Sequence, residues 1–172
     1  MRYRLLSVLV MLAMGMAMGH ESGCTPGYWK NNATTAVWGP TGYSPDQELG
    51  TVFNDTATIE GVAPFGMVNW DKIGIDPQDT LLQALNYGGG SGISGAAKIL
   101  LRAAVAALLN GAHPNVDGFP PAWVIKRTVG YLNGVEGQGL SYRGNILWLA
   151  TMLDGENNSG CPLDAFGRVV PK

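Results

Sequence analysis

The sequence predicts a mainly α fold: a single helical domain around a buried central helix, about residues 95–112, with a loop-rich N-terminal third and one disulfide joining the chain ends. Three observations lead to this prediction. One run of almost uninterrupted apolar residues has the length of a helix, and two later segments repeat apolar residues at helical spacing. The two cysteines stand near opposite ends of the chain once its first residues are set aside.

The first nineteen residues have the composition of a secretory signal peptide. Two arginines precede the apolar stretch LLSVLVMLAMGMAM, and small residues stand at Ala17 and Gly19, where a signal peptidase cleaves. The stretch is shorter than the roughly 20 residues that span a membrane. We therefore expect residues 1–19 to be a signal peptide and residues 20–172 to form a single secreted, mainly helical domain, extracellular or at the cell surface, with no membrane span in the mature chain.

The segment that follows favours loops. Gly, Pro, Asn and Thr recur over residues 31–45. One short helix is predicted to start at Ser44, because a serine followed by a proline suits the N-cap and the first helical position, and it should end before Asn54. Strand-like pieces near Val52 and over residues 67–70 are too short to predict a sheet.

The central helix is predicted from the long apolar run. Asp76 opens a shorter helix that carries TLLQALN, and the glycine-rich run GGGSG ends it. Ser94 then suits the N-cap of a helix over about residues 95–112, in which only Lys98 and Arg102 are charged. These two residues are one turn apart and share a face. A helix that is apolar almost all round is buried, so this helix is expected to form the core.

Two further helices follow. Pro121 suits the first position of one helix, which ends at Asn133 and Gly134. Ser141 suits the N-cap of the other, where apolar residues recur at helical spacing over residues 146–153. These segments complete the predicted helical core.

The two cysteines are Cys24 and Cys161. Disulfides persist in oxidising compartments, so a bond between them is the simplest prediction for an exported chain. A metal-bound pair is one alternative, although no CxxC motif and no neighbouring histidine completes such a site. A lipid on Cys24 is another, but the three residues before it lack an aliphatic side chain.

Three blocks of the chain resemble a known group of domains. The blocks are CTPGYWKN from Cys24 to Asn31, TLLQALNYGGG followed by ILLRAAVAALLN, and ENNSGCPL from Glu156 to Leu163. In this order they resemble an uncharacterised group in secreted and cell-surface bacterial proteins, with an N-terminal CTPGYWKN-type motif and a C-terminal GCPL-type motif. The resemblance implies an extracellular setting and the bond between the two cysteines, and it brings no catalytic residues. Such domains often have a histidine where this chain has Asn32.

Tyr28, Trp29 and Trp38 are candidate binding aromatics. Aromatic planes can bury the apolar faces of sugars while neighbouring amides bond hydroxyl groups. Three more tryptophans follow at Trp70, Trp123 and Trp148. The competing interpretation is that Tyr28 and Trp29 pack beside Cys24 and close one end of the core, since large aromatics are mostly buried.

No cofactor is expected, and two metal hypotheses stand as alternatives. Cleavage after the signal peptide would make His20 the mature N-terminus, and its two nitrogens could join His113 in a copper site. His113 could instead bond carbonyls at the end of the central helix. Asp154, Glu156 and Asn158 place oxygen ligands at alternate positions after a helix, which suits calcium, but a solvated helix end has the same pattern.

The predicted function is that of a non-catalytic extracellular or cell-surface module, structural or adhesive, acting by self-assembly or partner binding. The partner would be the protein itself, as a homo-oligomer or filament, or a cell-surface polymer or protein. A net charge of −2, from 11 basic and 13 acidic residues, leaves no basic patch for nucleic acid. The alternative is a secreted enzyme, either a glycan-directed hydrolase or a copper oxidase using its N-terminal histidine. Three sequons, at Asn32, Asn54 and Asn157, would matter only in a host that glycosylates asparagine.

Overall fold

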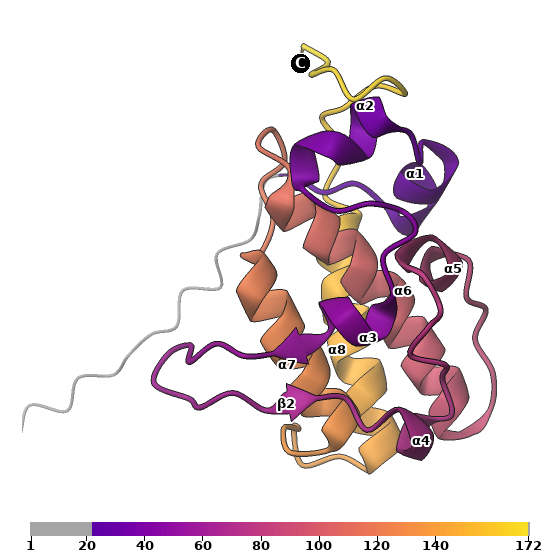
Figure 1. Ribbon diagram of the computed structural model, residues 1–172, viewed down its shortest axis with the longest axis vertical. Coiled ribbons are helices and arrows are strands. Elements are labelled where there is room, and N and C mark those ends of the chain that lie inside the picture. The colour runs from indigo at the N-terminus through magenta and orange to yellow at the C-terminus, as the bar shows by residue number, and fades with distance from the viewer. Residues whose placement is uncertain (1–21, 172) are drawn as a thin grey trace, which may run out of the picture.

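The structure of this chain, a computed structural model, describes residues 22–171. The signal peptide predicted over residues 1–19 lies outside the described residues. About half of the chain is helical, and a long central helix, α6 (Gly92–Ala112), runs through the middle of the molecule (Figure 1). The predicted central helix is thereby confirmed.

α6 is buried along most of its length. Among the described residues it is the one helix long and apolar enough to cross a membrane, and 67% of that stretch is buried inside the protein, as in a core helix. The helix begins earlier than predicted, because Ser91 takes the N-cap position and Gly92 is the first helical residue. Ser94 lies inside the first turn, where its hydroxyl donates to the carbonyl of Gly74 at 3.2 Å.

Two other long helices pack against α6 (Figure 1). α7 (Pro121–Asn133) begins and ends where predicted, with Gly134 at φ 76° directly after it. α8 (Tyr142–Asn157) follows Ser141, whose hydroxyl accepts a hydrogen bond from the backbone N–H of Gly144 at 3.1 Å. The apolar stripes of the three helices meet and form the centre of the core.

The chain before α6 contains more helical turns than predicted. They are α1 (Pro26–Asn31), α2 (Thr35–Trp38), the 3₁₀ helix η1 (Gly39–Thr41), α3 (Leu49–Val52), α4 (Trp70–Ile73) and α5 (Leu81–Leu85). The helix start predicted at Ser44 is wrong, since the chain makes a turn there and α3 begins after Glu48. α5 also starts later than Asp76, after Thr80, which forms a capping box with Gln83. A serine or aspartate followed by proline suits a turn as well as a helix start, which explains both errors.

A small sheet lies beside α7. β1 (Asn54–Asp55) pairs antiparallel with β2 (Gly66–Met67), with Asn54 opposite Met67. Residues 56–65 connect the two strands and extend to one side of the helices (Figure 1); we call them the hairpin loop. The sequence does not predict this sheet, because strands of two residues are too short to show an alternating pattern.

The disulfide between Cys24 and Cys161 is present, which confirms that prediction. Next to it, the backbone N–H of Gly23 donates to the carbonyl of Gly160 at 3.1 Å. The two ends of the described chain are therefore held together by one covalent bond and by backbone pairing. We call this region the disulfide end.

A pair of asparagines lies beneath the disulfide. The side chain of Asn110, on α6, accepts from the backbone N–H of Cys24 at 2.9 Å and donates to the carbonyl of Cys24 at 3.0 Å. Asn110 also donates to Asn157, whose amide donates in turn to the carbonyl of Ala103 at 2.9 Å. Asn157 is 1% exposed, so its sequon is closed to glycosylation in the folded protein.

Candidate functional site

The aromatic residues of the N-terminal motif belong to the core. Trp29 and Trp38 are 0% and 1% exposed and contact each other edge to face, with ring centroids 6.3 Å apart. The indole N–H of Trp29 donates to Asn110 at 2.9 Å, and the hydroxyl of Tyr28 donates to the carbonyl of Asp164 at 2.8 Å. Because both indoles are enclosed, Trp29 and Trp38 offer no face on which a sugar could stack, and Tyr28 is partly buried against the core.

Two of the later tryptophans lie together at the surface instead. A groove of about 260 Å³ runs between α7 and α8. It is lined by Trp123, Arg127, Tyr131, Gln138, Trp148, Leu149 and Met152, and we call it the aromatic groove. On α7 the lining residues recur every fourth position, and Trp148 and Met152 have the same spacing on α8, so each helix contributes one face.

Trp148 is the most accessible aromatic residue of the groove. Its ring stacks on that of Tyr131 at 11° and 5.9 Å between centroids, and the indole is 41% exposed whereas Tyr131 is 3% exposed. The hydroxyl of Tyr131 accepts from the side-chain amide of Gln138 at 2.8 Å. The inner face of Trp148 is thus supported by a buried ring. A parallel stack of Trp123 on Phe119, at 4.4 Å, supports the other end.

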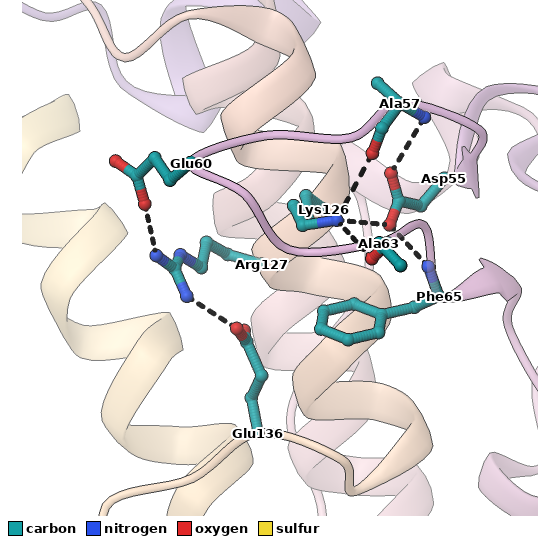
Figure 2. A network of polar contacts seen from close by, with 8 residues as sticks. All are labelled: Asp55, Ala57, Glu60, Ala63, Phe65, Lys126, Arg127 and Glu136. Carbon is teal, nitrogen blue, oxygen red and sulfur yellow. Dashed lines mark hydrogen bonds and ion pairs between the residues drawn. The ribbon is translucent and has the colours of Figure 1, made fainter.

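Arg127 gives the groove a charged rim. Its guanidinium lies 5.5 Å from the centre of the Trp123 ring. It forms an ion pair with Glu136 at 2.5 Å and another with Glu60 of the hairpin loop at 3.0 Å (Figure 2). Two carboxylates and one ring therefore hold this side chain in place. Through Glu60 the hairpin loop is tied to this rim residue.

Lys126, the residue before Arg127, fastens the same loop from inside (Figure 2). Its ammonium lies 3.2 Å from a carboxylate oxygen of Asp55 and donates to the carbonyls of Ala57 at 3.2 Å and Ala63 at 2.7 Å. The lysine and aspartate side chains are only 3% and 1% exposed. The carboxylate also accepts from the backbone N–H of Phe65 at 2.7 Å. Each polar atom of this buried pair has a hydrogen-bond or ion-pair partner, so the pair holds the base of the loop against α7.

Of the two residues in the copper hypothesis, the structure describes His113. His20 lies outside the described residues. His113 is 2% exposed beside Trp29, with ring centroids 6.0 Å apart, and its Nδ1 accepts from the backbone N–H of Asn115 at 3.3 Å. Burial lowers the pKa of His113 from its ordinary value. Its enclosed ring supports the core at this helix end and offers no nitrogen to the surface.

The calcium hypothesis assumes a loop where the structure has a helix. Asp154 and Glu156 both lie within α8, and residues two positions apart on a helix point in nearly opposite directions. Asn158 follows the helix, and its amide donates to the backbone carbonyl of Asp154 at 2.6 Å. Within residues 22–171, no group of three or more His, Cys, Asp or Glu side chains could hold a metal ion.

Comparisons of the chain with protein-family models, with curated proteins and with solved structures found no match. The resemblance carried by the CTPGYWKN-type and GCPL-type motifs therefore stays an expectation. Function is inferred from the aromatic groove and its surroundings. Sequence reasoning named Trp123 and Trp148 as aromatics that could add to a sugar-stacking face, but it missed Tyr131, Arg127 and Gln138. The four-residue spacing of Trp123, Arg127 and Tyr131 on α7 is a signal in the sequence, whereas Gln138 follows the helix and has no such signal.

Proposed function

We propose that this protein is a non-catalytic extracellular or cell-surface adhesive module that binds a cell-surface polysaccharide in the aromatic groove. One observation carries the proposal. Trp148 presents a flat, half-open indole that is stacked on a buried tyrosine and bordered by polar side chains. The disulfide supports the extracellular part of the proposal, since such bonds persist in oxidising compartments.

The chemistry of the groove suits a pyranose ring. Such a ring has apolar C–H faces, which pack on an aromatic plane, and hydroxyl groups at its edge, which need hydrogen-bond partners. Arg127 and Gln138 supply donors beside the tryptophans. The groove volume of about 260 Å³ is slightly below the usual range for ligand pockets, so one unit of a longer polymer fits the site better than a large free ligand.

Binding explains the carboxylates near the groove better than catalysis does. Glycoside hydrolysis uses two carboxyl groups that flank the scissile bond. Here Glu60 and Glu136 are both partners of the same guanidinium, and neither lines the groove. They hold Arg127 in position, which is a structural task.

The test is sedimentation of the mature protein with insoluble chitin, cellulose and cell walls isolated from the secreting cells. Retention on at least one polymer is expected. Trp148→Ala should weaken it about 10- to 30-fold, because exposed aromatic anchors contribute about 1.5 to 2 kcal/mol to binding. Phe166→Ala is the matched control, since that ring is 68% exposed and lies outside the groove.

Retention on none of the polymers, or equal retention of wild type and Trp148→Ala, would contradict the proposal. Release of soluble sugar during the incubation would favour the hydrolase alternative. Sedimentation of the protein without any polymer would favour self-assembly.

A further inference from the structure

A further cavity lies away from the aromatic groove, where the three motif blocks meet. It has a volume of about 520 Å³ and is formed by α1, the end of α5, α6 and the end of α8. Its polar lining includes Thr25, Lys30, Asn86, Arg102, Asp154 and Asn158. We call it the motif pocket. A smaller hollow of about 120 Å³ between α6 and α8 shares Arg102 and Asp154 with it.

Lys30 is the first cation of this pocket. Within residues 22–171 it has no hydrogen bond, ion pair or ring contact, whereas every other lysine and arginine there has at least one. It is exposed and lies in the last turn of α1. The burial of Trp29 therefore does not explain why the next position, residue 30, carries a lysine.

Arg102 is the second cation. One of its guanidinium nitrogens donates to the backbone carbonyl of Tyr87 at 3.1 Å, and it pairs with no carboxylate of the described residues. The side chain is thus oriented by a neutral group and keeps most of its donors for another partner. A guanidinium held in this way can form two parallel hydrogen bonds with a carboxylate.

The charged side chains of the motif pocket favour a ligand with one negative charge. Two cations without carboxylate partners lie on one pocket in a chain whose formal net charge is −2. Asp154 lines the same pocket, so the formal charges of Lys30, Arg102 and Asp154 sum to 2 − 1 = +1, which a ligand with one negative charge balances.

The remaining polar groups suit hydroxyl groups. The amide nitrogens of Asn86 and Asn158 donate to the carbonyls of Leu82 and Asp154. Their oxygens accept no hydrogen bond from residues 22–171, so both can accept from a ligand, as can the carboxylate of Asp154.

We propose that the motif pocket binds an acidic sugar of the uronic acid type, with its carboxylate on Arg102 and Lys30 and its hydroxyls on Asp154 and the two amides. This site is independent of the aromatic groove. It assigns a role to the polar residues of the motif blocks, whose aromatic residues serve the core.

The experiment is an NMR titration of the mature protein with D-glucuronate, D-glucose, inorganic phosphate and N-acetylglycine. Glucuronate should shift the amide signals of pocket residues, bind at least about tenfold more tightly than glucose, and lose affinity as ionic strength rises. Arg102→Gln and Lys30→Gln should each weaken glucuronate binding about tenfold or more.

Arg143→Gln is the matched control, because Arg143 also donates to a backbone carbonyl, that of Gly92 at 3.2 Å, but lies outside the pocket. It should leave glucuronate binding unchanged, and so should Trp148→Ala, which separates this site from the groove.

Equal binding of glucose and glucuronate would overturn the proposal, as would tighter binding of phosphate. Equal binding of N-acetylglycine would replace the acidic sugar by a peptide carboxylate and so overturn the assignment. Unchanged affinity in Arg102→Gln, with its fold confirmed by circular dichroism, would also overturn it.

Discussion

The disulfide end and the hairpin loop each attach a non-helical segment to the helical core, and they do so through different interactions. At the disulfide end the attachment is covalent and neutral: Cys24 is bonded to Cys161, and its backbone is hydrogen-bonded to the side chain of Asn110. At the hairpin loop the attachment is ionic, through the buried pair of Lys126 and Asp55.

The difference predicts which conditions weaken each attachment. A covalent bond between distant residues acts mainly by restricting the unfolded chain, so reduction removes it and salt does not. A buried ion pair resists salt because water and ions do not reach it, but loss of one partner leaves an uncompensated charge in the interior. The two regions should therefore respond to different changes.

The largest effect is expected from breaking the covalent attachment. Cys24→Ser combined with Cys161→Ser opens a loop with a sequence separation of 137 residues. The free energy of unfolding should fall by about 4 to 5 kcal/mol in the chain-entropy model, which corresponds to roughly 10 to 15 °C in melting temperature. Calorimetry of the variant, and of wild type with reductant, measures this. An unchanged melting temperature would mean that the asparagines alone hold the disulfide end.

The next effect concerns the ionic attachment. Lys126→Met keeps the length of the side chain but leaves the carboxylate of Asp55 buried without its cation. We expect a loss of about 3 to 5 kcal/mol in the free energy of unfolding, measured by denaturant titration. The control is Lys98→Met, since within residues 22–171 the ammonium of Lys98 pairs with no carboxylate and lies 5.8 Å from the centre of the Tyr87 ring. Equal losses of unfolding free energy in both variants would show that breaking the buried pair costs no more than removing the ammonium of Lys98.

A smaller effect is expected at the rim of the hairpin loop. Glu60→Gln removes one ion pair of Arg127 in which the glutamate side chain is 62% exposed. Exposed ion pairs contribute little to stability, so the free energy of unfolding should fall by less than about 1 kcal/mol, and this difference should vanish at high salt. The same denaturant titration measures both. A loss as large as that of Lys126→Met would place the main attachment of the loop at its surface.

The smallest effect is a pH dependence of the disulfide end. Burial lowers the pKa of His113, so the unfolded chain binds this proton more readily than the folded protein. The stability due to neutral His113 is complete above about pH 6.5, the ordinary histidine value, and is lost as the pH falls from there toward the lower pKa of the folded protein. Melting curves at neutral and mildly acidic pH should differ less in His113→Asn than in wild type. Identical pH dependence in both would contradict this.

Much of the helical core could be predicted from the sequence, and particular residues show why. Pro121 and Gly134 bound α7, and Ser141 precedes α8, because caps act through hydrogen bonds within one turn. The start of α6 was predicted less well. Ser91 and Ser94 both suit an N-cap, and the contact of Ser94 with Gly74, twenty positions earlier in the chain, is invisible to local rules.

The candidate sites were less predictable for the same reason. The four-residue spacing of Trp123, Arg127 and Tyr131 shows that they share a face of a helix, but it does not show that Trp148 of α8 lies opposite them. Likewise, Lys30 and Arg102 belong to separate motif blocks, and only the packing of α1 beside α6 brings them to one pocket.

The sequence by itself determined the three long helices, the burial of the central one and the pairing of the two cysteines, since periodicity, caps and cysteine count are properties of short segments or of composition. Only the tertiary structure decided which tryptophans are enclosed and which are open, and which cations lack a carboxylate. Those properties depend on which faces of distant segments meet. Trp29 and Trp148 are chemically identical side chains, and their neighbours make one a core residue and the other the centre of the proposed site.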